Sequence, residues 1–408
     1  MTEATQQRRK PRIIMVSGKG GVGKTTAAAA TAVALAARGK KTIVMSFDLA
    51  HSLADSFNMT DELFSTAKGR PVTVRDNLDF QEIDVQEEMQ RNWGDVYKYI
   101  AYLLMGGGLD GIVAEEAAIM PGMEDIIALL HINQYAREGI YDVIVVDCPP
   151  TSESLRFVSI IGSIDWYVRK RLKIDRRVAS VLRPIAKKFG AESMMLPDDG
   201  YFAALQSLFE KLEGVEAMLH DPTITSLRLV TMADQMVVRE TQRAYMYFNL
   251  YGIAIDTVVV NRMLPKGDGY FSHWVERQTA MLETVHSYFD PVPIAIIPFQ
   301  QTEVIGIERL ELFAAQLYGD ADPAEVRVAT APFCFSKISD DEHRLTIQLR
   351  FAPKDKVEIS RENEDIFIRI GTFKRVILLP RALVAMQTAG AKMNGDGLEI
   401  TFRKEAQA

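Results

Sequence analysis

Short apolar runs separated by helix-forming segments dominate the first three quarters of the chain. Seven runs of five or six residues predict strands, at 12–17, 42–47, 78–83, 142–146, 226–231, 256–260 and 293–297. Helices are expected in most of the gaps, with Gly39 and Gly252 as C-terminal caps. This alternation predicts an α/β domain with a mostly parallel sheet, over residues 1–320.

Two long segments do not fit a minimal α/β domain. Residues 85–137 and 155–223 both have helical patterns and are longer than ordinary connections between strands. We therefore predict a helical subdomain inserted beside the sheet.

The pattern changes after the turn-rich segment 318–323. Apolar side chains then recur at every second position, as at Leu345, Ile347, Leu349, Ile366, Ile368 and Ile370. Short alternating strands separated by Pro, Gly, Asn and Asp predict an all-β sandwich over residues 326–405.

Composition narrows the classes of function. The chain has 408 residues, of which 48% are hydrophobic and 25% charged, as in ordinary globular proteins. Its net charge of −7 argues against nucleic acid as a partner. No run is long enough to span a membrane, and the basic N-terminus leads into a strand and not a signal-peptide core. We expect a cytoplasmic protein, or one of a similar soluble compartment such as a stroma.

A glycine-rich loop lies between the first expected strand and the first expected helix. Residues 18–26 read Gly-Lys-Gly-Gly-Val-Gly-Lys-Thr-Thr, which fits the phosphate-binding P-loop. We expect Lys24 between the β- and γ-phosphates of ATP and the Thr25 hydroxyl on Mg²⁺. The residues expected to surround the nucleotide are Gly18, Gly20, Gly21, Val22, Gly23, Lys24, Thr25 and Thr26.

Two aspartates follow expected strands, at the edge of the sheet where ligands bind. Asp48 can position a water for attack on the γ-phosphate, although a helix N-cap or a turn would use the same residue. Asp147 is the expected acidic partner of Thr25 and Mg²⁺, the alternative being a turn before two prolines.

These motifs resemble the ArsA/Get family, which contains the ATPases of arsenite-efflux pumps and those that target tail-anchored membrane proteins. The resemblance rests on the P-loop, on Asp-Leu-Ala-His-Ser-Leu at 48–53 and on Asp-Cys-Pro-Pro-Thr-Ser-Glu-Ser-Leu-Arg at 147–156. Further matches are Glu-Thr-Gln-Arg at 240–243, Val-Val-Asn-Arg at 259–262 and Ile-Pro at 297–298. It covers residues 12–317 and implies an ATP hydrolase.

The resemblance also assigns roles to individual residues. Asp48 would position the attacking water in a first switch that includes His51 and Ser52. The second switch would include Thr151 and Glu153, where the family often has Thr-Gly-His and this chain has Thr-Ser-Glu. This departure must alter how the nucleotide is coupled to the dimer.

Other implied roles concern the adenine base of ATP and the partner subunit. Asn261 would read the adenine edge, next to Arg262 and the loop that begins at Pro298. Lys19 matches the signature lysine that reaches the nucleotide of a partner subunit and contributes to catalysis there, so the functional unit would be a homodimer.

The chain has two cysteines, Cys148 and Cys334, and they are far apart. They cannot form the Cys-x-x-Cys with which some targeting ATPases share zinc, so we expect no zinc. A cysteine cluster for trivalent arsenic is missing as well, which counts against arsenite. An anion or metalloid transport ATPase remains the first alternative, followed by a switch of the ParA/MinD kind.

The helical segments are rich in methionine and other apolar residues. Methionine adapts to varied apolar partners, so these side chains suit a groove for transmembrane segments or other apolar clients. The alternative is that they only pack the subdomain. The candidate groove residues are Met105, Met120, Met123, Met194 and Met195. A basic stretch at 169–188 suits transient contact with a membrane, or is a solvated helix face.

The C-terminal segment resembles the α-crystallin domain of small heat-shock proteins. Phe-Ala-Pro at 351–353 and Gly-Asp-Gly-Leu-Glu-Ile at 395–400 carry this likeness, together with the rhythm of the strands. Client holding, dimer support and partner docking all remain open as its role.

Overall fold

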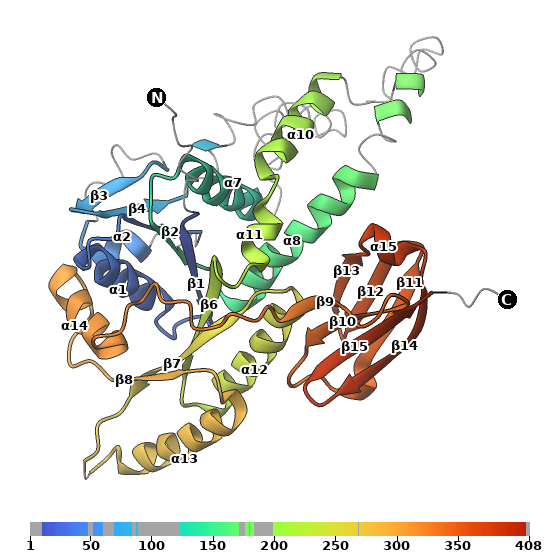
Figure 1. Cartoon of the computed structure of the whole chain (residues 1–408). Coiled ribbons are helices and arrows are strands. Elements are labelled where there is room, and N and C mark those ends of the chain that lie inside the picture. Colours follow the sequence, from blue (N-terminus) through green and yellow to red (C-terminus); the bar gives the residue numbers. More distant parts are fainter. Residues whose placement is uncertain are drawn as a thin grey trace, which may run out of the picture.

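The strands of the first domain form one large sheet. The computed structural model describes residues 10–47, 52–59, 69–83, 87–88, 123–170, 176–178, 180–182, 199–267 and 269–404. Within them, eight strands lie in the order β3-β4-β2-β5-β1-β6-β7-β8 (Figure 1). Their bounds are β1 (Arg12–Gly18), β2 (Thr42–Ser46), β3 (Val72–Arg75), β4 (Leu78–Glu82), β5 (Val143–Asp147), β6 (Thr225–Met232), β7 (Ile255–Met263) and β8 (Ile294–Pro298).

All seven expected strands are present and pair in parallel, so the predicted α/β class is confirmed. The eighth, β3, runs antiparallel to β4 at the edge of the sheet. Its side chains are partly exposed, so its sequence lacks the apolar run by which the buried strands are predicted.

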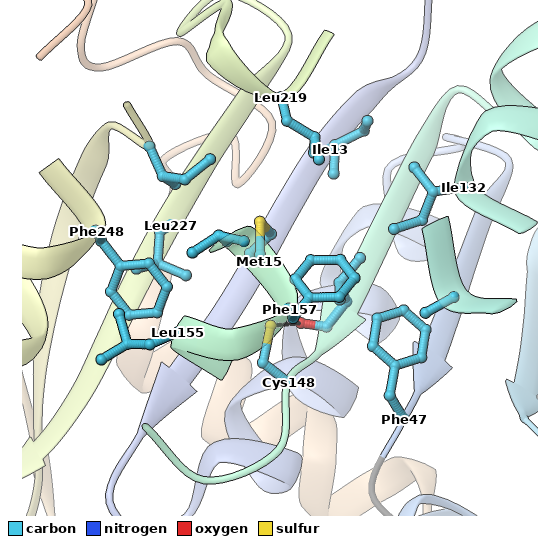
Figure 2. Close-up of a cluster of buried hydrophobic side chains, with 14 of the residues drawn as sticks. Ile13, Met15, Phe47, Ile132, Cys148, Leu155, Phe157, Leu219, Leu227 and Phe248 are labelled. Carbon is cyan, nitrogen blue, oxygen red and sulfur yellow. Dashed lines mark hydrogen bonds between the residues drawn. The ribbon is translucent and has the colours of Figure 1, made fainter. Parts of the chain in front are cut away.

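Helices cover both faces of the sheet. Side chains of β1 alternate between two buried clusters, with Ile13 and Met15 in one and Ile14 and Val16 in the other. Figure 2 shows part of the first cluster, to which α8 contributes Phe157. The helices are α1 (Lys24–Ala37), α2 (Ser52–Phe57), α7 (Met123–Glu138), α8 (Thr151–Lys170), α10 (Asp199–Leu212), α11 (Val215–His220), α12 (Gln235–Leu250), α13 (Ser272–Phe289) and α14 (Ile307–Tyr318).

The described parts of the two long insertions are helical. α7 packs along α10, and the Asn133 side chain donates to the Lys211 and Glu213 carbonyls at the end of α10. The side chain of Arg137 donates to the same Glu213 carbonyl, at 2.7 Å. These bonds join the two insertions into one helical region beside the sheet (Figure 1).

The C-terminal segment folds as two antiparallel sheets, which confirms the predicted all-β class. Their orders are β14-β15-β10-β9 and β11-β12-β13. Leu345, Ile347 and Ile368 are fully buried between them, as the alternating pattern predicts. The elements are β9 (Phe333–Lys337), β10 (Glu342–Gln348), β11 (Val357–Glu362), β12 (Asp365–Ile370), β13 (Phe373–Leu378), β14 (Gln387–Asn394) and β15 (Gly397–Arg403), with a short helix α15 (Arg381–Val384).

A buried ion cluster holds the linker between the two domains. Arg228 donates to the Tyr318 hydroxyl and to the Pro323 carbonyl, and its Nε lies 3.3 Å from an Asp256 oxygen. Arg12 lies 3.5 Å from the other oxygen of Asp256. Burial alone would raise the pKa of Asp256, but the two guanidinium groups lower it overall. The carboxylate is therefore ionised and pairs with both cations.

Replacing Asp256 with asparagine is expected to lower the free energy of unfolding by about 3–5 kcal/mol, because two buried cations lose their counter-charge. Urea unfolding followed by circular dichroism measures this loss. Asp340→Asn, which removes an exposed pair with Lys337, is the matched control, with an expected change of about 0–1 kcal/mol. Equal losses in both variants would show that the cluster does not stabilise the fold.

Candidate active site

The glycines of the P-loop are required for two different physical reasons. A Cβ on Gly18 would lie 2.2 Å from the Val230 carbonyl, and one on Gly23 would lie 2.4 Å from the Asn261 amide nitrogen. At Gly20 and Gly21 a Cβ would meet no atom within 4 Å. The first pair therefore lets the loop pack against β6 and β7, and the second leaves its outer side open to a ligand.

Lys24 lies at the start of α1, beneath this open side of the loop. Its side chain is buried, and its Nζ donates to the Lys19 carbonyl at 3.3 Å. No carboxylate of the described residues lies within salt-bridge distance of that Nζ. A buried lysine that bonds a loop carbonyl, next to backbone N–H groups and a helix N-terminus, fits the phosphates of a nucleotide.

Thr25 faces the first switch. Its hydroxyl lies 3.4 Å from the Ser52 hydroxyl, at the start of α2. Glu82, which the sequence analysis did not single out, accepts hydrogen bonds at 3.0 Å from the Leu53 and Ala54 amides. This buried carboxylate at the end of β4 therefore fixes the N-terminus of α2 against the P-loop.

The second switch begins beside the strand that leads into the P-loop. Asp147 ends β5, is buried, and lies level with Val16 of β1 and Ser46 of β2. The Thr151 hydroxyl at the start of α8 is buried and has no hydrogen-bond partner among the described residues. Glu153 is exposed in the first turn of α8, where a negative charge is favourable.

Ser154 ties this switch to β1. Its hydroxyl donates to the Pro149 carbonyl at 2.5 Å and lies 3.1 Å from the Ser17 hydroxyl. The sequence analysis did not identify Ser154, because Ser17 lies 137 positions away. Serines next to glycine or proline turns are common, so no local signal marks this pair.

An ion pair connects the second switch to the helical region. The Arg156 Nε donates to Asp125 of α7 at 2.9 Å, and the same guanidinium pairs with Glu124. Burial raises the pKa of Asp125 to about 6, against the opposing effect of Arg156, so the carboxyl is ionised at neutral pH. The second turn of α8 is therefore bonded to the first turn of α7.

The predicted base-contacting residues lie together at the ends of β7 and β8. The Asn261 amide donates to the Val22 carbonyl at 2.8 Å, and its oxygen accepts from the Arg262 backbone at 2.9 Å. Arg262 is exposed with φ of 59°, and Pro298 is opposite Met263 in the sheet. Asn261 thus supports the P-loop itself, a contact that the sequence analysis did not foresee; its role toward adenine stays a prediction.

Several predicted residues lie outside the described part of the chain, namely Asp48, His51, Met105, Met120, Met194 and Met195. Met123 is described, and there the groove prediction is corrected. It is 5% exposed and belongs to the core on which α7 packs. Its apolar side chain therefore stabilises the fold and does not line an open groove.

Replacing Gly23 with alanine is expected to weaken ATP binding at least tenfold, because the new methyl group collides with Asn261 and shifts the loop. The residue also has φ of 95°, where a side chain costs about 1–3 kcal/mol. Gly39→Ala is the matched control, since it has φ of 76° but no atom within 4 Å of the added Cβ. Titration with a fluorescent ATP analogue measures both affinities, and equal affinities would contradict the proposed packing of the loop.

Comparison with known protein families gives two matches. Residues 11–319 match the model described as anion-transporting ATPase, named ArsA ATPase. Residues 340–402 match an HSP20-like domain found in ArsA. The two matched regions correspond to the α/β domain and to the C-terminal sandwich.

Similar proteins extend over most of the chain. A protein of Aquifex aeolicus named "Putative arsenical pump-driving ATPase 1" is 41% identical over 395 residues, covering 95% of this chain and 99% of its own. A protein of Chlorobaculum tepidum, named "Putative arsenical pump-driving ATPase", is 33% identical over 97% of both chains. The "ATPase get3" of Aspergillus niger is 28% identical over 77% of this chain and 92% of its own.

Among the described helices, none is long and apolar enough to cross a membrane.

Proposed function

Since the chain belongs to the ArsA family of anion-transporting ATPases and carries the HSP20-like domain found in ArsA, we propose that it is a homodimeric ATPase that opens and closes a groove for apolar clients. The clients that suit such a groove are transmembrane segments, as in the targeting of tail-anchored membrane proteins. ATP binding would favour one state of the groove and hydrolysis the other.

One observation carries this proposal. α8 begins at the second switch with Thr151 and continues to Lys170, so a single helix about 30 Å long extends from the nucleotide site toward the helical region (Figure 1). Its first turns are bonded to β1 through Ser154 and to α7 through Arg156. A displacement at the γ-phosphate would therefore move the helices that would form the groove.

The residues of the site would have different roles in ATP hydrolysis. Bound Mg²⁺–ATP supplies the phosphoanhydride bond and the metal charge. Lys24 and the loop amides would bind its phosphates, Thr25 would hold the magnesium ion, and Asp147 would orient the water molecules around that ion. Asp48 would orient the attacking water, and Lys19 of one subunit would neutralise charge at the nucleotide of the other.

Exposed apolar side chains support the homodimer. The ends of β6, β7 and β8 lie at the same edge of the sheet as the P-loop, and the segments that follow them carry four exposed apolar side chains: Met236 in α12, Tyr270, Trp274 in α13 and Phe299. A second copy of the chain would cover them while presenting its own Lys19.

The names of the bacterial relatives favour a second candidate, an arsenical pump-driving ATPase. The positions of the cysteines oppose it, since Cys148 is buried in the α/β domain and Cys334 is exposed on β9. Arsenite or antimonite would increase ATP turnover severalfold if this candidate were correct. Unchanged turnover with both would exclude it.

Copurification tests the proposed client. Asp48→Asn protein would be expressed with a soluble reporter that carries one C-terminal transmembrane helix, then purified with ATP and Mg²⁺. The proposal expects the reporter to co-elute, and a matched reporter with a polar helix to be absent. With the ATPase folded and ATP-bound, absence of both reporters would contradict the proposed client, and equal recovery of both would show that the apolar helix is not recognised.

A further inference from the structure

α12 connects the P-loop to the HSP20-like domain. Near its beginning, Glu240 Oε2 lies 3.8 Å from Lys19 Nζ. At its last residue, the Leu250 carbonyl accepts a hydrogen bond from Arg375 of β13. Ten residues separate these two contacts, so one rigid helix joins them over about 15 Å. Figure 1 shows α12 between the α/β domain and the red strands of the C-terminal domain.

Phe351 is the first anchor of the C-terminal domain. Its ring lies 5.9 Å from Tyr245 of α12, 6.0 Å from Tyr288 and 5.8 Å from Phe289, both of α13. Its backbone has φ of 71°, which is unfavourable for a bulky residue and persists only where the surroundings hold it. The neighbouring Arg350 donates to the Asp290 carbonyl at 2.6 Å. These contacts hold the HSP20-like domain against α12 and α13.

Arg375 is the second anchor. Its guanidinium is buried and lies 4.3 Å from the centre of the Phe333 ring. Burial lowers the pKa of Arg375 to about 10, so it remains charged at neutral pH. A cation that binds the last carbonyl of a helix is favourable with respect to the helix dipole. Next to it, the rings of Tyr247 and Phe373 lie 3.9 Å apart. The C-terminal end of α12 is therefore fixed by the HSP20-like domain.

The contact at the other end of α12 is weak. The Lys19 side chain is 38% exposed, and an exposed ion pair of this kind contributes about 0–1 kcal/mol. Lys19 can therefore readily exchange Glu240 for another anionic partner. If Lys19 moves to the nucleotide of the partner subunit, as the proposed function requires, Glu240 loses its cation and α12 loses this bond to the P-loop, while Val238 and Thr241 keep the helix packed on the sheet.

We propose that the HSP20-like domain regulates the ATPase through α12. While Phe351 and Arg375 fix the helix, Glu240 retains Lys19 and slows its transfer to the partner's nucleotide. Loss of the docked domain releases the C-terminal end of the helix, weakens the Lys19–Glu240 pair and accelerates turnover. The equilibrium between the two partners of Lys19 is coupled to domain docking, and coupling of equilibria is reciprocal, so nucleotide binding that draws Lys19 from Glu240 also loosens the docking of β13. The proposal depends on the role proposed for Lys19, but not on the identity of any client.

The ATPase rate of the full chain tests this proposal. Arg375→Met is expected to raise the basal rate about fivefold or more, the lower range of measured couplings between sites. Lys374→Met is the matched control, because the neighbouring Lys374 is exposed and its Nζ lies over the Phe367 ring within its own domain. Glu240→Gln is expected to give a rise of the same size. The double variant is expected to equal either single variant, since both changes remove the same restraint on Lys19.

The free-energy effects of distant, independent sites add, so their effects on a rate multiply. A double variant whose change in rate is the product of the two single changes would therefore overturn the proposal. Arg375→Met with the wild-type rate would overturn it as well. If Arg375→Met fails to fold, amide hydrogen exchange tests the proposal with the wild type and with Glu240→Gln instead. Bound ATP analogue should increase exchange in β13 of the wild type and have no such effect in Glu240→Gln, and equal exchange with and without nucleotide in the wild type would contradict the coupling.

Discussion

Replacing Lys24 with alanine is expected to lower ATP turnover by about 10²- to 10³-fold and to weaken nucleotide binding, the largest effect that we expect from any single change. Its side chain is buried at the base of the P-loop, where the Nζ donates to a loop carbonyl, whereas the Lys19 side chain is 38% exposed and pairs with Glu240. Steady-state release of phosphate and titration with a fluorescent ATP analogue measure the two losses.

Lys356→Ala is the control for this change, because Lys356 is an exposed lysine of the HSP20-like domain. It should leave turnover and affinity within the error of the wild type. A Lys24→Ala protein that is folded, as judged by its thermal unfolding, and that still hydrolyses ATP at the wild-type rate would show that the P-loop is not the nucleotide site.

The second large effect is expected at Asp48, where asparagine should slow hydrolysis by about 10²- to 10⁴-fold while leaving ATP affinity nearly unchanged. Asparagine keeps the size of the side chain but cannot accept a proton from the attacking water. Single-turnover hydrolysis with bound ATP separates this defect from one in binding. Hydrolysis at the wild-type rate would contradict the role proposed for Asp48, and a large loss of affinity would assign the residue to binding instead.

The buried parts of the fold could be predicted from the sequence. Strands covered on both faces, such as β1 and β5, are continuous apolar runs, and the inner strands of the sandwich alternate with a period of two. The pattern did not predict β3, β9 and β14. The side chains of β14 are mostly exposed, so its pairing with β15 depends on backbone hydrogen bonds that leave no trace in the residue pattern.

The candidate site was predictable only where its residues are close in sequence. The P-loop and its lysine form one local motif, which lies between β1 and α1 in the structure. The contact of Asn261 with Val22 joins residues 239 positions apart, and Glu82 reaches α2 from another strand. Such contacts arise from the order of strands in the sheet, which the residue pattern does not determine.

The docking of the HSP20-like domain could not be predicted either. The sequence marked Phe351 only as part of a resemblance, and nothing near it indicated three aromatic partners on α12 and α13. Buried aromatic residues are ordinary core residues in any sequence. Their function as an interface between domains follows only from the position of each domain in three dimensions.

The most direct test of the central claim is the affinity of a fluorescent apolar helical peptide for Asp48→Asn protein, measured once with ATP and once with ADP. A nucleotide can shift the groove between two states only if the client distinguishes those states. The account predicts affinities that differ by about tenfold or more between ATP and ADP. Equal affinities with the two nucleotides, in protein shown to bind both, would contradict the claim that ATP drives client binding.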